Sequence, residues 1–341
     1  MTIENQVLEI IEGKKSAPLT KALLHVMSHC YRGGIALRHL AYDTVIPTTH
    51  LSVPVVSVGN IVAGGTGKTP VVEYLAKALS PLNVAILTRG YRRKGTQTTL
   101  VQATTPVEEC GDEPYLLAQK LPGATILVDS NRSVAGFLAQ SLGADIILLD
   151  DGMQHRKLHR DIEIGVLHAD DLFGKGYYLP RGLLRDQPKR LAKADILLLN
   201  GVKDEDHFHT LETLIRPYSS APLTALELLV SNSTQVASKK VAAFCAIAAP
   251  TRFYNTLKSL GCDIVHTAQK PDHIAFSEEE LELLANRAVD AGAECLVCTE
   301  KDAVKLPRDF KHQLPLIPLE IALQPTFGKE HLETLIKKVK S

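Results

Sequence analysis

Residues 53–70 read VPVVSVGNIVAGGTGKTP, and this stretch decides the class of fold. An apolar run from Val53 to Val58 breaks into a glycine-rich turn that ends in Gly-Lys-Thr, and a helical pattern follows from Val71 to Leu79. Such a turn directs unpaired backbone N–H groups inward at the positive end of a helix dipole, a geometry that binds phosphate. The stretch therefore predicts a P-loop and the use of a nucleoside triphosphate.

The loop offers a group for each part of a bound nucleotide. Lys68 is expected to reach the terminal phosphates, and the Thr69 hydroxyl to take a place on Mg²⁺. Val62 stands where the usual consensus has a further glycine, and Ala63 replaces the extra lysine of one variant subgroup. An incidental glycine turn is the alternative, and the flanking strand and helix argue against it. The predicted nucleotide-binding residues are Gly64, Gly65, Thr66, Gly67, Lys68 and Thr69.

Length and composition are those of an ordinary globular protein. The 341 residues, 45% hydrophobic and 22% charged, can bury a full core and form two domains. The formal net charge is zero, so the chain lacks a nucleic-acid-binding signature and we expect no nucleic-acid partner. No secretory signal or run of ~20 apolar residues is visible, so we expect the protein to stay in the cytoplasm. Cys295 and Cys298 would face opposite sides of a strand, which argues against a zinc site.

The N-terminal segment carries a local charge bias. From Lys14 to Tyr42 there are basic residues and histidines but no acidic residue, with leucines between them. A basic, partly amphipathic helix can lie on an anionic membrane surface. A helix that packs on the domain with a solvated basic face is the alternative, and the residues alone favour it.

Strand and helix patterns alternate along the rest of the chain. We therefore predict an α/β fold, with a P-loop NTPase-like parallel sheet domain and a second, smaller α/β domain. The Ser/Thr-rich segment 219–240 is the expected join between them. The predicted divisions are an N-terminal basic helical segment at 1–42, a nucleotide-binding domain at 43–218 and a C-terminal domain at 219–341.

Two groups of acidic residues are candidates for chemistry. Asp150 and Asp151 follow the all-apolar run 146–149, where a carboxylate could hold Mg²⁺ opposite Thr69. Two acids that simply begin a loop are the alternative. Asp112 and Glu113 follow Gly111 and precede a helix, so they suit either an N-cap or a general base, and their spacing does not choose.

A histidine and two basic clusters complete the set of candidates. His273, in a loop of the second domain, is either a solvated side chain or the partner of an acid. The basic clusters would suit an anionic substrate, or they form solvated faces. The first contains Arg89, Arg92, Arg93 and Lys94, and the second contains Arg181, Arg185, Lys189, Arg190 and Lys193. In the second cluster, Arg181 and Arg185 follow residues 177–180 in a turn rather than on a helix face, which favours a site slightly.

These motifs, in this order, resemble the tetraacyldisaccharide 4′-kinase family, which phosphorylates a lipid A precursor. The P-loop alone is generic, and the blocks at 150–155 and 299–306 are much more specific. The resemblance covers about residues 30–310 and is carried by 58–70, TRGY at 88–91, GDEP at 111–114, DDGMQH at 150–155, LPRGLLR at 179–185, PDH at 271–273 and TEKDAVKL at 299–306.

The resemblance implies ATP- and Mg²⁺-dependent phosphorylation of the 4′-hydroxyl of a tetraacyldisaccharide 1-phosphate, in lipid A and lipopolysaccharide biosynthesis. It implies two α/β/α domains joined by a small β-linker, with the active site in the cleft between them. Asp112 and His273 would form a catalytic dyad across that cleft. Asp150 and Asp151 fall on the metal-associated acids, and Glu113, Gln154, Arg181 and Arg185 become candidates for substrate contact.

The resemblance also bears on location and on rival functions. Family members are peripheral proteins on the cytoplasmic face of the inner membrane, which favours the membrane interpretation of the N-terminal helix. We expect a lipid disaccharide substrate and no obligate protein partner. The main rival is a P-loop switch ATPase or GTPase that acts through partners, and Ala63 counts against it. A nucleotide-binding scaffold without turnover is disfavoured by Lys68, Thr69 and Asp150.

Overall fold

The computed structural model describes residues 10–11, 17–91, 93–272, 274–307, 310 and 312–340. The chain divides into two compact units, and each is assembled from stretches that are separated in sequence. Unit 1 comprises Met1–Arg89, Gly123–Glu227 and Gln324–Ser341, and unit 2 comprises Gly90–Pro122 and Leu228–Leu323. This division differs from the predicted one, because residues 90–122 leave the nucleotide-binding unit and the last residues return to it.

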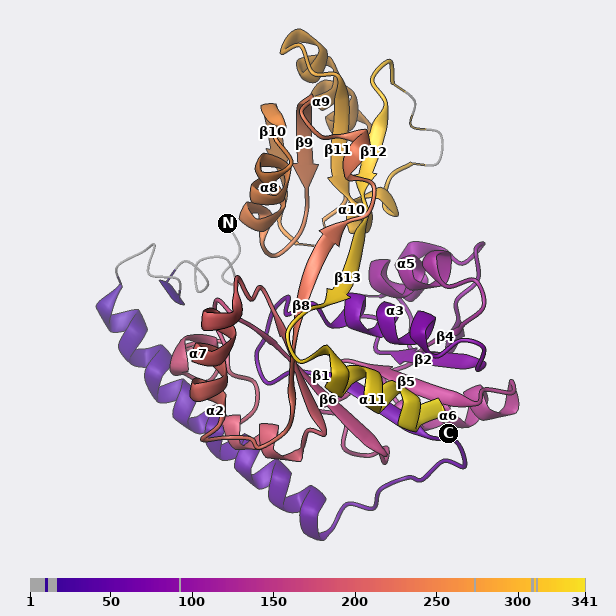
Figure 1. Cartoon of the computed structure of the whole chain (residues 1–341), viewed down its shortest axis with the longest axis vertical. Helices are drawn as coiled ribbons and strands as arrows, with labels where there is room; N and C mark the ends of the chain where they lie inside the picture. The colour runs from indigo at the N-terminus through magenta and orange to yellow at the C-terminus, as the bar shows by residue number, and fades with distance from the viewer. Residues whose placement is uncertain are drawn as a thin grey trace. The chain divides into compact units, whose positions relative to one another are not determined.

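Unit 1 is built on a parallel sheet with the strand order β8-β7-β6-β1-β5-β2-β4 (Figure 1). The central strand is β1, which leads into the P-loop. The strands are β1 Val55–Gly59, β2 Val84–Thr88, β4 Thr125–Val128, β5 Ile146–Asp150, β6 Ile162–His168, β7 Ile196–Asn200 and β8 Leu223–Val230. The helices of the unit are α2 Pro18–Thr44, α3 Lys68–Ala78, α6 Arg132–Ser141, α7 Glu205–Ile215 and α11 Lys329–Lys340, with short 3-10 helices η1 Gly174–Gly176 and η2 Pro188–Lys193.

Helices cover both faces of this sheet, which explains why its strands are almost wholly apolar. On one face, side chains of α3 and α11 surround a small space together with Val56 and Leu148. On the other face, α6 packs against Val55 and Ile147, and α7 packs against the β7 residue Leu197. Successive strand residues point to opposite faces, so one apolar run serves both layers. The predicted α/β fold with a parallel sheet is confirmed.

Unit 2 contains a second parallel sheet, with the order β10-β9-β11-β12. Helix α8 packs on the face that carries Cys295, and α9 packs on the face that carries Cys298. The two cysteines therefore lie on opposite faces of β11, as predicted, and both thiols are free. The elements are β3 Thr99–Leu100, α4 Val107–Cys110, α5 Asp112–Lys120, η3 Ser233–Gln235, β9 Lys240–Cys245, α8 Pro250–Ser259, β10 Asp263–Gln269, α9 Glu278–Asp290, β11 Cys295–Thr299, α10 Glu300–Ala303, β12 Leu316–Leu319 and β13 Ile321–Pro325.

The join between the units is a pair of strands. The segment expected as a polar join, 219–240, contains the whole of β8, and the chain returns to unit 1 through β13, the neighbour of β8 in the strand order. Ser277 and Glu280 form a capping box at the start of α9. The P-loop helix begins at Lys68 rather than at Val71, since the first turn has no apolar periodicity to reveal it.

Candidate functional site

The P-loop leaves β1 at Gly59 and ends where α3 begins at Lys68. Gly64 and Gly67 have φ angles of 109° and 88°, a region that favours glycine. At Gly64 and Gly65 an added Cβ would meet nothing within 4 Å, so the loop presents an open backbone surface. These residues give the turn and helix start that bind phosphate in other P-loops.

Val62 occupies the position of the missing glycine for a structural reason. The residue is 4% exposed and forms an antiparallel bridge with Leu184. The N–H of Ala63 donates to the carbonyl of Leu183 at 2.7 Å, and the N–H of Arg185 donates to the carbonyl of Ile61 at 2.9 Å. The start of the loop is therefore held as a strand-like pair, in which a β-branched residue fits better than glycine.

Two asparagines brace the loop from beneath. The Asn60 side-chain amide donates to the Thr66 hydroxyl at 2.7 Å, and the Asn200 amide donates to the Thr66 carbonyl at 2.5 Å. A Cβ on Gly67 would collide with the Asn200 amide, so the brace also requires glycine there. Sequence reasoning missed Asn200, although one signal was present: it is a polar residue that closes an all-apolar strand, as Asp150 does in β5.

The two acids at the end of β5 lie beside the P-loop strand. The β1–β5 register pairs Val58 with Asp150, which is 3% exposed. Asp151, with a positive φ of 57°, directs its carboxylate to Arg185, whose Nη1 donates to Oδ2 at 2.8 Å, and to Lys68, whose Nζ lies 3.5 Å from Oδ1. Burial alone would raise the pKa of Asp151, but the hydrogen bonds and charges of Arg185 and Lys68 lower it well below its usual range.

The candidate substrate residues of unit 1 are Gln154, Arg181 and Arg185, and they have different surroundings. Arg185 contacts Asp151 and both oxygens of Asn60, and the Gln154 amide donates to the Asn60 carbonyl at 2.8 Å. These two residues are therefore part of the loop's surroundings. Arg181 lies apart from them, with its guanidinium 4.6 Å from the ring centroid of Tyr177.

Asp112 opens α5 in unit 2, and its conformation is set by the residues on either side. Gly111 reaches a φ of 95°, which lets the chain turn into the helix, and the N–H of Glu113 donates to the Asp112 Oδ1 at 3.0 Å. Asp112 is 8% exposed and lines a cavity of about 1040 Å³ within unit 2. Glu113 forms an ion pair with Lys301.

The position of His273 lies outside the described residues, so the predicted dyad stays a prediction. One part of that prediction changes. Sequence placed Asp112 and His273 in different domains, whereas the division of the chain assigns 90–122 and 228–323 to the same unit. A pairing of the two residues would therefore form inside unit 2.

Helix α2 exposes several large apolar side chains beside its basic and polar ones. Leu19 is 87% exposed and Leu37 is 70% exposed. Leu19, Leu23, Val26, Leu37 and Leu40 recur at helical spacing and form what we call the exposed leucine face. Residues 1–9 and 12–16 of the predicted N-terminal segment, which include Lys14 and Lys15, lie outside the described residues.

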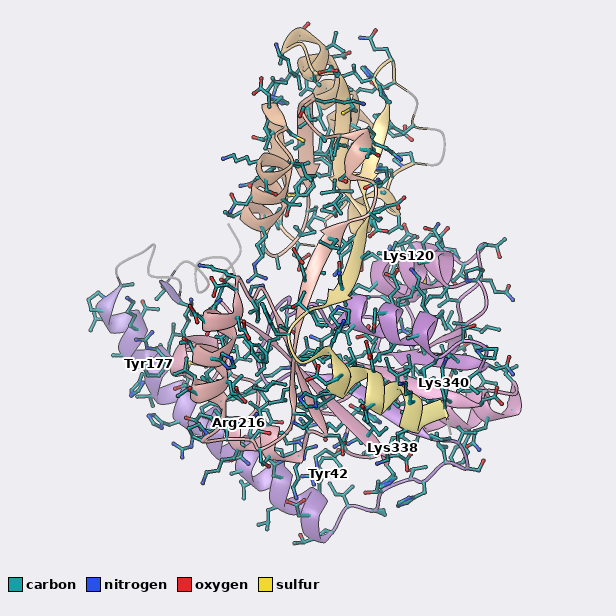
Figure 2. All side chains as sticks on the ribbon, viewed as in Figure 1. Tyr42, Lys120, Tyr177, Arg216, Lys338 and Lys340 are labelled. Atoms are coloured by element: carbon teal, nitrogen blue, oxygen red, sulfur yellow. The ribbon has the colours of Figure 1, made fainter. Side chains whose placement is uncertain are left out.

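The inward side of α2 makes polar contacts to unit 1. His39 Nε2 lies 2.7 Å from Asp186 Oδ1, and the Tyr31 hydroxyl donates to the Arg185 carbonyl at 3.3 Å. Aromatic rings lie toward both ends of the helix (Figure 2): Tyr177 packs edge-on against His25, and Tyr42 lies under the Arg156 guanidinium. These contacts, together with the buried Leu24 and Ser28, fasten one side of the helix to unit 1, and the exposed leucine face lies away from it.

None of the described helices is both long enough and apolar enough to cross a membrane.

Comparisons with known proteins agree with this geometry. The family model described as tetraacyldisaccharide-1-P 4′-kinase matches residues 20–340. A tetraacyldisaccharide 4′-kinase of Syntrophus aciditrophicus is 37% identical, with 91% of each chain covered, and one of Chlamydia trachomatis is 36% identical, over 82% of this chain and 79% of that protein. A crystal structure of LpxK from Aquifex aeolicus in complex with ATP matches with a TM-score of 0.75 and 30% identity, over 94% of this chain and all of that one. From the loop, the acids and these matches together, the chain belongs to the tetraacyldisaccharide-1-P 4′-kinase family.

Proposed function

We propose that this chain transfers the γ-phosphate of ATP to the 4′-hydroxyl of a tetraacyldisaccharide 1-phosphate, a step in lipid A biosynthesis. The observation that carries the proposal is that the P-loop lies beside Asp150 and Asp151. The family model also matches most of the length of this chain. The Aquifex relative was crystallised with ATP, and the curated relatives are named for this acceptor.

The residues of unit 1 hold the phosphate donor. The backbone amides of the P-loop and the Lys68 ammonium bind the phosphates, and Asn60 and Asn200 keep the loop in shape for them. Because Arg185 and Lys68 keep Asp151 ionised, the carboxylate is available throughout the physiological pH range.

The donor set beside the loop fits Mg²⁺. Thr69, Asp150 and Asp151 offer only oxygen atoms, which this cation prefers. The described residues contain no cluster of three or more His, Cys, Asp or Glu that could hold a metal alone. A cation that shares its ligands between one or two carboxylates and the nucleotide phosphates needs no such cluster. When bound, Mg²⁺ neutralises phosphate charge during transfer.

The acceptor hydroxyl must lose a proton as it attacks. Asp112 accepts that proton, and His273 orients the carboxylate. Glu113, Gln154, Arg181 and Arg185 are the candidates for contact with the acceptor.

Transfer of label tests the proposal directly. Purified full-length protein with γ-labelled ATP, Mg²⁺ and detergent-dispersed tetraacyldisaccharide 1-phosphate is expected to give a labelled lipid. An acceptor already phosphorylated at the 4′ position is expected to give none. Failure to label the unmodified acceptor would contradict the proposal, and ATP hydrolysis without transfer would favour the switch ATPase instead.

We further propose that α2 binds the cytoplasmic face of the inner membrane through its exposed leucine face. Replacing Leu23 with glutamate is expected to weaken binding to anionic lipid vesicles by tenfold or more, because burial of one leucine side chain contributes about 1.5–3 kcal/mol. Vesicle co-sedimentation measures the change.

Leu283 in α9 provides the matched control for this substitution. It is 51% exposed, against 60% for Leu23, and the change Leu283→Glu adds the same charge to unit 2. Equal loss of vesicle binding in the two variants, or no loss for Leu23→Glu, would rule out a specific role of α2.

A further inference from the structure

The segment 299–302, Thr-Glu-Lys-Asp, has no part in the phosphate site described above. It follows β11 in unit 2 and forms the short helix α10. The cavity beside Asp112 is lined in part by Glu300 of this helix and by residues of α5. The segment therefore lies where it can act on the proposed base.

Helix α10 is held firmly although it has only four residues. Asp302 is 2% exposed, and its carboxylate accepts hydrogen bonds from the Thr299 hydroxyl at 2.6 Å and from the N–H of Ala246 at 3.1 Å. Lys305 Nζ lies 3.0 Å from the same carboxylate. Because these contacts come from the end of β9 and from both sides of α10, they fix the backbone that carries Lys301.

Two ion pairs join α10 to α5 within unit 2. Lys301 contacts the carboxylate of Glu113, and Glu300 Oε1 lies 2.8 Å from Nζ of Lys120, which is labelled in Figure 2. Glu113 and Lys120 are seven residues apart, about two helical turns, so they lie on one side of α5. Glu300 also accepts the N–H of Ile321 at 3.1 Å. The first pair is next to Asp112 and the second lies at the other end of the helix.

The charge on Lys301 acts on Asp112 as well as on Glu113. Desolvation would lower the pKa of Lys301, but the carboxylates of Glu113, Asp112 and Asp272 together raise it, so the ammonium stays charged at any assay pH. The attraction is mutual, and Lys301 stabilises the ionised form of Asp112 in turn.

A thiol and several charged side chains also lie near Asp112. Burial raises the pKa of Cys110 to about 11, so this thiol is neutral in the assay range. The remaining charged residues that line the same cavity are Arg93, Lys94, Glu108, Lys120, Glu300, Lys305 and Glu320.

We propose that Lys301 is the positioning residue of the proposed base: it anchors Glu113 and, with it, the start of α5, and its charge keeps the Asp112 carboxylate ready to accept a proton. This inference rests on the proposed kinase function and adds to it an electrostatic partner on α10.

The pH dependence of kcat for lipid phosphorylation tests the inference with full-length protein. Replacing Lys301 with methionine is expected to move the acid limb of the profile to higher pH by about one unit, because loss of a nearby positive charge raises the pKa of a carboxyl group. Lys301→Gln is expected to do the same, and Lys301→Arg to keep the limb near its original place.

Lys120→Met is the matched control. It removes the same charge from the other α5–α10 pair, about 12 Å along the helix from Asp112, where the Coulomb interaction with that carboxylate is weaker. It is expected to leave the acid limb unmoved. Thermal unfolding shows whether each variant is folded.

Each result separates the inference from the proposed function. No transfer by the unmodified protein would overturn the function itself. Transfer with an unmoved acid limb in the folded neutral variants, an equal shift in Lys120→Met, or failure of both neutral Lys301 variants to fold would overturn the positioning role.

Discussion

Replacing Lys68 with methionine is expected to lower kcat for phosphate transfer by about 10²–10³-fold, the scale of removing one preorganised donor from a transition state. Lys68 opens α3, and only 15% of its side chain is exposed. We expect the variant to fold, because Arg185 still neutralises Asp151 after the lysine is removed. Steady-state transfer rates and ATP titration measure the effect, and ATP affinity is expected to fall as well.

Lys77 offers the control for this substitution. It lies in the same helix, is 56% exposed and pairs with Glu73 across one turn at 2.6 Å. Helix pairs at this spacing contribute about 0.3–0.5 kcal/mol when exposed. Glu73 is only 9% exposed, so Lys77→Met is expected to keep kcat, and thermal unfolding measures its effect on stability. Unchanged kcat in Lys68→Met would refute its role on the phosphates.

The change Asp112→Asn is expected to lower kcat by about 10²–10⁴-fold, the range of a general base. Asparagine keeps the size of the side chain and an oxygen that accepts from the N–H of Glu113, so α5 should keep its start. Because Asp112 belongs to unit 2 and the P-loop to unit 1, the dissociation constant for ATP is expected to change by less than about threefold, under 1 kcal/mol.

Parallel measurement of kcat and of ATP affinity distinguishes a role of Asp112 in proton transfer from a role in nucleotide binding. Asp290→Asn, at the exposed end of α9, makes the same chemical change away from the cavity and should leave both quantities unaltered. A parallel loss of ATP affinity in Asp112→Asn would point to a nucleotide-binding role, and retention of kcat would remove Asp112 from the mechanism.

The parts of the site that sequence predicted are those encoded by neighbouring residues. The strand, glycine turn and helix of the P-loop follow one another, and Asp150 closes an apolar strand. Parallel strands bring their carboxyl ends to one edge, so the two motifs could be expected to meet there. The register of Val58 with Asp150 bears this out.

The parts that sequence did not predict depend on contacts between distant residues. Sequence alone did not explain why Val62 replaces the consensus glycine of the loop. Its bridge to Leu184 explains it. The division of the chain places 90–122 in the same unit as α10, and the ion pairs between α5 and α10 lie within that unit. Spacing along the chain does not reveal such pairs. The strand β8 was hidden in a stretch with a polar composition.

The orientation of the α2 leucines could not be predicted from the sequence. Sequence identified the basic, partly amphipathic pattern but could not tell which side would be turned outward. The contacts of Tyr31 with the Arg185 carbonyl and of His39 with Asp186 determine which side of the helix faces unit 1. Sequence could not reveal them, because both partners lie far along the chain.

The return of the last helix to unit 1 has a consequence for synthesis of the protein. Leu335, Ile336 and Val339 of α11 lie against the face of the central sheet, beside Val56 of the strand that leads into the P-loop. Domains commonly fold as they leave the ribosome, amino-terminal parts first. Here one face of the sheet in unit 1 lacks the helix that packs on it until α11 has emerged from the ribosome. All residues of unit 2 have been synthesised before α11. A nascent chain stalled ahead of residue 329 would expose that apolar sheet face to chaperones.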